Sequence, residues 1–196
     1  MKIGFDCDDI LAAYTLTLAR DYNQQFGTAY RPEDITPLIG QWKMRFGSEM
    51  ERQLWEITLR DEFCLSLPPV SGAVEGISRV RSLGHELYLV TGREKSPPEM
   101  TLRWLQSLFG NAFTKVLYSN SITGLTKGQI ARQLGLDAFV DDIPYHILAV
   151  RDAGIPVIVL DYEWNKEVPE GDHLVRVGSW PEISSVLTRG IPPKSL

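Results

Sequence analysis

Residues 2–9 read KIGFDCDD, a short apolar run that ends in three acidic side chains, Asp6, Asp8 and Asp9. A run of this kind is typical of a buried strand, so the three carboxyl groups would lie at its carboxyl end. Carboxylates this close repel one another unless a cation lies among them. An Asp-x-Asp after a strand is usually a turn or a helix cap. A metal site is the alternative, and it requires further evidence from the rest of the sequence.

Further apolar runs follow in the second half of the chain and are continuous rather than alternating, as expected for strands buried on both faces of a parallel sheet. They occupy residues 85–91, 115–119, 137–141 and 155–161, with a weaker one at 173–177. Helical patterns lie between them, at residues 73–83, 98–109 and 144–153. This alternation with short connections predicts an α/β fold with a doubly wound, parallel, Rossmann-like sheet.

About sixty residues after the first strand break the alternation and have helical periodicity instead. We expect one helix over residues 11–26, ended by Gly27, and a second one opened by a capping box of Ser48 and Glu51 and running to about Phe63. Aromatic residues are dense in this stretch and predict a small core.

The break in the alternation divides the chain into two predicted domains. Residues 1–11 and 70–196 form the α/β core, and residues 12–69 form a helical cap inserted after the first strand. Pro68 and Pro69 mark the return of the chain to the core.

Composition excludes several classes of function. The chain has 196 residues, 43% of them apolar, and a net charge of −5 without clustered basic residues, which argues against a nucleic-acid polymer as partner. Two cysteines, Cys7 and Cys64, define no disulfide framework. No apolar stretch approaches the roughly 20 residues that span a bilayer, so we expect no membrane partner. These features predict a cytoplasmic protein, and they carry no signal for its oligomeric state.

Chemically active side chains recur at the ends of the predicted strands. Ligands of an open parallel sheet bind beyond the carboxyl ends of its strands, and that edge would carry Asp6 and Asp8, then Thr91-Gly92-Arg93, and then Asp141-Asp142. A capping box of Thr126 and Gln129 places Lys127 in the first turn of a helix leading into the same edge. Each motif alone has an ordinary structural explanation as a turn, a cap or a surface lysine. The joint occurrence of these motifs at one edge of the sheet favours a functional site there.

The donor set and the missing motifs narrow the chemistry of that site. Clustered carboxylates without a set of His or Cys ligands favour Mg²⁺ over Zn²⁺. The chain contains no G-x-G-x-x-G, G-x-x-x-x-G-K-[ST] or G-x-S-x-G motif, and DCDDIL lacks the glycine of a Ca²⁺-binding loop. Cys7 has no His partner near it in the sequence and is expected in the core.

In these motifs the chain resembles the haloacid dehalogenase (HAD) superfamily of phosphohydrolases. The four signatures appear as Asp6-Cys7-Asp8, as Thr91 after the apolar LYLV, as Lys127, and as Asp141-Asp142 after DAFV. The helical insertion matches the position of the family's small cap. Asp9 departs from the pattern, because many members have glycine there.

The resemblance implies a mechanism. Mg²⁺ would be held by the Asp6 carboxylate, the Asp8 carbonyl and the pair Asp141-Asp142, with the direct ligand of that pair left open. Asp6 would be the nucleophile that forms an aspartyl-phosphate, and Asp8 the general acid and base. Dehalogenating members lack this second acid, so Asp8 favours phosphate chemistry.

The resemblance also implies how substrate is held. Thr91 and Lys127 would act in catalysis and bind the phosphoryl group together with Gly92. Arg93 is a further candidate for holding the substrate.

A narrower resemblance is to the 5′-nucleotidase, deoxy (pyrimidine), cytosolic type C branch. It rests on residues 162–166, YEWNK, and on residues 68–72, PPVSG. We therefore expect a phosphatase for a small phosphorylated metabolite, namely a (deoxy)nucleoside 5′-monophosphate. The alternatives are a phosphatase for sugar phosphates or other phosphometabolites, and a non-catalytic binding or regulatory protein with the same fold.

Overall fold

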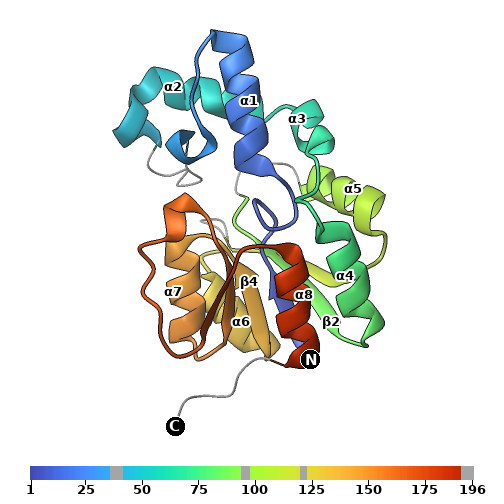
Figure 1. Ribbon diagram of the computed structural model, residues 1–196. Helices are drawn as coiled ribbons and strands as arrows, with labels where there is room; N and C mark the ends of the chain where they lie inside the picture. The colour runs from blue at the N-terminus through green and yellow to red at the C-terminus, as the bar shows by residue number, and fades with distance from the viewer. Residues whose placement is uncertain (36–41, 94–97, 120–122, 191–196) are drawn as a thin grey trace.

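Six parallel strands form one sheet in the order β3-β2-β1-β4-β5-β6 in the computed structural model of the chain (Figure 1). The structure describes residues 1–35, 42–93, 98–119 and 123–190. The strands are β1 (Lys2–Phe5), β2 (Glu86–Thr91), β3 (Phe113–Tyr118), β4 (Ala138–Asp141), β5 (Val157–Leu160) and β6 (Leu174–Val177). All the strands predicted from the sequence are confirmed.

Side chains along the strands alternate between two buried layers. Ile3 and Phe5 of β1 lie in one layer, which is covered by α4 (Ala73–Ser82), α5 (Pro98–Phe109) and α8 (Trp180–Arg189). Tyr88 and Val90 of β2 lie in the other, which is covered by α6 (Lys127–Leu134) and α7 (Pro144–Asp152). A parallel sheet covered on both faces is a doubly wound α/β fold, so the predicted fold class is confirmed.

Between β1 and α4 the described chain is mostly helical and lies beyond the carboxyl ends of the strands (Figure 1). The elements are α1 (Tyr14–Phe26), the 3-10 helix η1 (Pro32–Ile35), α2 (Trp42–Thr58) and α3 (Asp61–Ser66). Aromatic rings pack among them, with ring centroids 4.6 Å apart for Tyr22 and Phe26 and 5.2 Å apart for Trp42 and Trp55. The predicted aromatic core is confirmed. The two-domain division itself stays a prediction, and its cap includes residues 36–41, which lie outside the described residues.

Two helix boundaries in this region differ from the sequence prediction. The first helix begins at Tyr14 rather than at residue 11, because Leu11 lies in a turn and Ala12 forms a bridge with Pro69. The predicted helix from Ser48 to about Phe63 is wrong at its end: α2 stops at Thr58 and α3 is separate. Arg60 has extended backbone angles (φ −74°, ψ 133°) that turn the chain so that α3 packs against α5.

Helix α8 had no counterpart in the sequence prediction. Trp180, at its first position, is buried and its ring stacks on Phe5 of β1 at 5.9 Å. Among the described residues, no helix is long and apolar enough to cross a membrane.

Candidate active site

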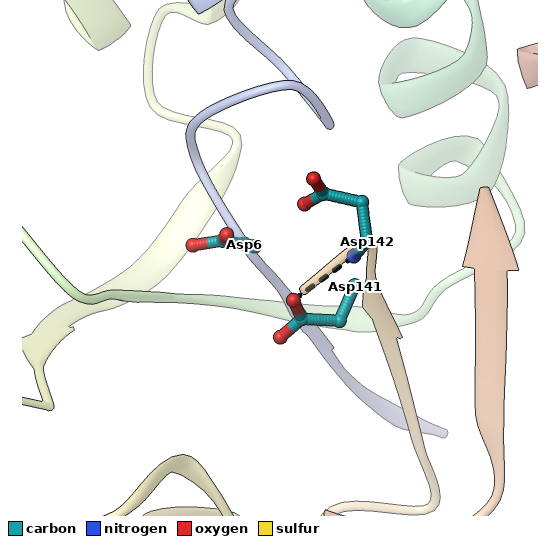
Figure 2. A group of neighbouring side chains, drawn as sticks. All are labelled: Asp6, Asp141 and Asp142. Carbon is teal, nitrogen blue, oxygen red and sulfur yellow. Dashed lines mark hydrogen bonds between the residues drawn. The ribbon is translucent and has the colours of Figure 1, made fainter. Parts of the chain in front are cut away.

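Three buried carboxyl groups meet at the carboxyl ends of β1 and β4 (Figure 2). Asp6 follows β1, Asp141 ends β4 and Asp142 is the next residue. One oxygen of each lies within 4.8 Å of the others. The backbone N–H of Asp6 donates to the Val140 carbonyl at 2.9 Å, so the pairing of the two central strands fixes this grouping.

Lys127 supplies the positive charge of the cluster. Its Nζ lies 2.8 Å from Asp6 Oδ1 and 2.8 Å from Asp141 Oδ2, and the side chain is fully buried. Burial disfavours the charged ammonium, but Asp141 and Asp6 outweigh this effect and raise the pKa of Lys127 above its ordinary value. The predicted capping box of Thr126 is present and begins α6 at this residue.

One ammonium does not balance three carboxylates, which leaves two negative charges when all of these groups are ionised. Burial raises the pKa of Asp6 to about 7, against the lowering effect of Lys127. Burial, and then the charge of Asp9, raise the pKa of Asp142 well above its ordinary value. A divalent cation would supply the missing charge, and oxygen ligands suit a hard cation such as Mg²⁺.

The hydrogen bonds of the Asp141-Asp142 pair differ. Asp141 Oδ1 accepts from the backbone N–H of Asp142 at 2.9 Å (Figure 2). It also accepts from the Ile143 N–H at 3.1 Å, and Asp141 Oδ2 accepts from Lys127. Asp142 Oδ1 is buried and has no hydrogen-bond partner among the residues that the structure describes. A buried carboxylate oxygen without a donor is costly unless something positive meets it. The cluster therefore fits a cation, and Asp142 offers it the unoccupied oxygen.

Asp8 lies outside this group of three. Its carboxylate accepts from Arg93 Nε at 3.1 and 3.0 Å, and the guanidinium also donates to Thr101 Oγ1 at 3.0 Å. Arg93 Nη1 contacts Cys64 Sγ of α3 at 3.4 Å. The arginine is thus buried and paired with the predicted acid/base, and it joins this residue to α5 and α3. Its predicted contact with substrate stays a prediction.

Thr91 and Gly92 reach the same edge from β2. Thr91 is fully buried, and its Oγ1 accepts from the Arg93 backbone N–H at 3.3 Å. A Cβ on Gly92 would lie 3.4 Å from His146 Nε2. Burial and then the charge of Lys127 lower the pKa of His146, which keeps this ring neutral. The buried Ser119 Oγ, just beyond β3, has no hydrogen-bond partner in the described part of the chain, and the sequence prediction did not include it.

Asp9 has a structural explanation that the sequence did not provide. Its backbone is left-handed (φ 56°), the region that favours glycine, which many HAD members have here. Its carboxylate accepts from the Thr15 backbone N–H at 2.9 Å and from the Thr15 hydroxyl. Asp9 therefore tethers the first turn of α1 to the site.

The connection after β5 also reaches the site, through contacts that sequence reasoning missed. Trp164 Nε1 donates to Asp142 Oδ2 at 2.9 Å, and the Asn165 side chain donates to the Asp142 carbonyl at 2.9 Å. Tyr162 donates its hydroxyl to the Asp9 carbonyl at 2.8 Å. The sequence had singled out residues 162–166 as a segment, but their partners lie on other strands.

Two linkers carry the chain between the sheet and the helices above the site. They pair as an isolated bridge between Ala12 and Pro69. A buried tryptophan of the core holds each one: Trp180 Nε1 donates to the Ile10 carbonyl at 2.7 Å and Trp104 Nε1 to the Leu67 carbonyl at 2.8 Å. The linkers fix where α1 and α3 stand over the aspartates.

Solved structures with a similar fold include haloacid dehalogenase-like proteins. The structure matches a haloacid dehalogenase-like hydrolase from Streptococcus pneumoniae with a TM-score of 0.67 and 13% identity, over 94% of this chain and 96% of that one. It matches L-2-haloacid dehalogenase from Xanthobacter autotrophicus with a TM-score of 0.63 and 14% identity, over 97% and 99%. Identities this low show the fold alone, which is that of a HAD hydrolase.

Sequence similarity narrows the class to one family. Residues 1–191 match the family described as 5′ nucleotidase, deoxy (pyrimidine), cytosolic type C protein, and the chain belongs to this family. A protein of Oceanobacillus iheyensis described as a candidate nucleotidase is 29% identical over 172 residues, 85% of this chain and 89% of that protein. A Clostridium acetobutylicum protein described as a nucleotidase is 24% identical over 118 residues, 59% of this chain and 58% of that protein. The chain is a phosphomonoester hydrolase, as the resemblance predicted.

Proposed function

We propose that this protein is a Mg²⁺-dependent nucleotidase that hydrolyses (deoxy)nucleoside 5′-monophosphates through an aspartyl-phosphate. The observation that carries the proposal is the buried cluster of Asp6, Lys127, Asp141 and Asp142, with one carboxylate oxygen left without a donor. Both the attacking carboxylate and a phosphate ester are anionic, so such a reaction requires concentrated positive charge at this edge of the sheet.

The cation would be held by Asp6, by the free oxygen of Asp142 and by the Asp8 carbonyl. Mg²⁺ prefers oxygen ligands and retains several waters. When bound, it would neutralise the charge that accumulates between carboxylate and phosphate. Asp141, whose oxygens already accept three hydrogen bonds, would orient Lys127 and support the site.

In the first step, a carboxylate oxygen of Asp6 attacks phosphorus and the bond from phosphorus to the ester oxygen breaks. The leaving alkoxide takes a proton from the protonated carboxyl group of Asp8. Lys127 and the Thr91 hydroxyl, with the N–H groups near Gly92, hold the phosphoryl oxygens as charge gathers on them.

In the second step, water attacks the phosphorus of the aspartyl-phosphate. The Asp8 carboxylate accepts the proton of that water, the bond from phosphorus to Asp6 breaks, and inorganic phosphate leaves. Both aspartates then return to their starting forms. Asp8 lies outside the group of three carboxylates and its side chain accepts from Arg93, so we assign it proton transfer, not the cation.

The names of the matched family and of two relatives support a nucleotide as the substrate. Sugar phosphates and other small phosphometabolites are the competing substrates, and a non-catalytic binding protein is the competing function. The complete set of Asp6, Asp8, Thr91 and Lys127 supports an enzyme. A cytoplasmic location is part of the same proposal.

The test is phosphate release from a panel of ribo- and deoxyribonucleoside 5′-monophosphates and sugar phosphates, with Mg²⁺ or with EDTA. We expect the highest kcat/KM for nucleotides, loss of turnover in EDTA, and a hydroxylamine-sensitive phosphoenzyme after rapid quenching. Asp6→Asn should abolish turnover and leave the fold intact, whereas Asp172→Asn, at an exposed position, should change nothing. Turnover by pure Asp6→Asn protein would refute the nucleophile, and binding of nucleotides without turnover by the parent would favour the binding protein.

A further inference from the structure

Trp164 is the side chain that determines which oxygen of Asp142 is free. Its indole N–H donates to Asp142 Oδ2 at 2.9 Å, and the other oxygen of the same carboxylate is buried without a partner. One oxygen of Asp142 lies within 4.8 Å of an oxygen of Asp6 and of an oxygen of Asp141. One oxygen of this carboxylate is therefore bonded to Trp164, and the other is left available to a ligand.

Trp164 is itself held in place by its surroundings. Its ring stacks on Tyr162, with centroids 4.3 Å apart and planes inclined by 9°, and the Tyr162 hydroxyl is bonded to the Asp9 carbonyl. Asn165, the next residue, bonds the Asp142 and Leu160 carbonyls at 2.9 and 2.8 Å. Since both Trp164 and the backbone of Asp142 are fixed by this one connection, their relative orientation is fixed as well.

We propose that Trp164 is a positioning residue for the divalent cation: it makes Asp142 a one-oxygen ligand and so favours Mg²⁺ over Ca²⁺. The inference rests on the proposed function, since it requires the aspartates to bind a divalent cation. A hydrogen bond to the second oxygen of a ligating carboxylate orients that ligand, and loss of such outer-shell partners typically costs 10–100-fold in metal affinity.

The selectivity follows from how the two cations bind carboxylates. Mg²⁺ requires near-ideal octahedral geometry at about 2.1 Å, whereas Ca²⁺ is larger, takes six to eight oxygens and accepts both oxygens of one carboxylate. With Oδ2 engaged by the indole, Asp142 presents a single oxygen. Removing the indole N–H frees Oδ2 to approach the cation, which suits Ca²⁺ better than Mg²⁺.

The experiment is calorimetric titration of the metal-free protein with Mg²⁺ and with Ca²⁺, without substrate. Trp164→Phe removes the donor and keeps an aromatic ring. We expect its Mg²⁺ affinity to fall about tenfold or more and its Ca²⁺ affinity to fall less, so that the ratio of the two affinities decreases. Replacing Trp164 with benzothienylalanine, an isostere with sulfur in place of the N–H, should give the same result while keeping the stacked shape.

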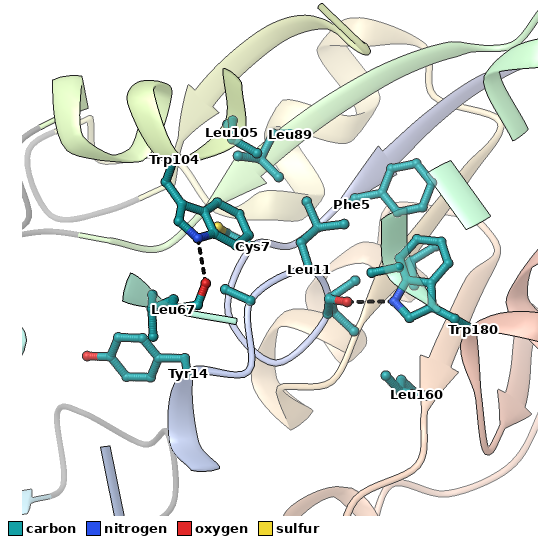
Figure 3. Close-up of a cluster of buried hydrophobic side chains, with 14 of the residues drawn as sticks. Phe5, Cys7, Leu11, Tyr14, Leu67, Leu89, Trp104, Leu105, Leu160 and Trp180 are labelled. Atoms are coloured by element: carbon teal, nitrogen blue, oxygen red, sulfur yellow. Dashed lines mark hydrogen bonds between the residues drawn. The ribbon is translucent and has the colours of Figure 1, made fainter. Parts of the chain in front are cut away.

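Trp104→Phe is the matched control. Its indole N–H also makes a buried hydrogen bond, but to the Leu67 carbonyl rather than to a carboxylate (Figure 3). We expect it to lower thermal stability and leave both cation affinities unchanged. Thermal shifts induced by each cation provide a second readout if one variant is too unstable for calorimetry.

The other possible results would refute either the proposed cation or the role of Trp164. If the parent binds no Mg²⁺, the cation of the proposed function is refuted. If the parent binds Mg²⁺ but both Trp164 variants match it, or lose Mg²⁺ and Ca²⁺ affinity equally, only the role of Trp164 is refuted. If the variants keep both affinities and the KM rises for nucleoside monophosphates but not for sugar phosphates, Trp164 stacks on the base instead, which also overturns the inference.

Discussion

Replacing Lys127 with methionine removes the one positive charge that the described residues place inside the aspartate cluster. The ammonium is fully buried and lies 2.8 Å from an oxygen of Asp6 and from an oxygen of Asp141. Methionine fills a similar volume, so the substitution deletes the charge and two charge-assisted hydrogen bonds without opening a large cavity. In the metal-free protein the described residues then offer the carboxylates no counter-charge inside the cluster.

The size of the effect follows from this geometry. Removing one partner of a buried ion pair typically costs 3–5 kcal/mol, because the remaining charge stays buried and unpaired. For a chain of this size, such a loss lowers Tm by roughly 6–20 °C. Protonation of the carboxylates relieves the repulsion, so the loss should be larger at about pH 8 than at about pH 5.5.

We would measure the loss of stability by thermal and urea unfolding of the metal-free Lys127→Met protein, in EDTA, at both pH values. Lys115→Met, at an exposed position on β3, is the control and should stay within about 0.5 kcal/mol of the parent. A Tm change below about 2 °C that is the same at both pH values would refute the reasoning, because it would mean that the buried cluster does not depend on the lysine charge.

Three further predictions concern the same edge of the sheet. The Asp6 pKa of about 7 lies above its ordinary value of 3.8, so the folded state binds this proton more tightly than the unfolded state. Metal-free stability should therefore fall, by up to about 4 kcal/mol from this group, as pH rises from about 4 to about 7; Tm scans in EDTA test this, and an equal slope in Asp6→Asn would contradict it. Asp9→Ala should lose about 2–3 kcal/mol in urea unfolding, since it deletes two bonds from Thr15 and keeps a left-handed backbone; Asp9→Gly should lose less, and the reverse order would argue against backbone strain. Gly128→Ala should cost more than about 2 kcal/mol in urea unfolding, because the Cβ would lie 2.1 Å from the Ala149 carbonyl oxygen; a neutral result would mean that α6 and α7 separate easily.

The sheet could be predicted from the sequence because its strands are continuous apolar runs ended by polar residues. The helices above the site were harder, since no glycine or proline marks the break between Thr58 and Asp61. Helix α8 did carry a start signal, a serine followed by a proline at the first turn (Ser179, Pro181), which had not been used.

The rule that parallel strands end at one edge was enough to bring Asp6, Lys127 and the Asp141-Asp142 pair together. It says nothing about which oxygen each donor meets, because hydrogen-bond partners depend on side-chain rotamers and on loops. The pairing of Arg93 with Asp8, 85 residues apart, is of this kind. So is the bond of Trp164 to Asp142, which comes from a connection on the far side of β4 and carries no local signal.

The acidic run after β1 does not form a single site, although its three carboxylates are adjacent in the sequence. Asp6 faces Lys127, Asp8 faces Arg93, and Asp9 faces Thr15. The repulsion within the run is thus relieved by three different partners. The oxygen left without a donor belongs to Asp142, on β4's side of the edge. The proposed cation would therefore bind where the two central strands meet, not within the acidic run itself, and a variant of Asp142 should affect metal binding more than a variant of Asp9.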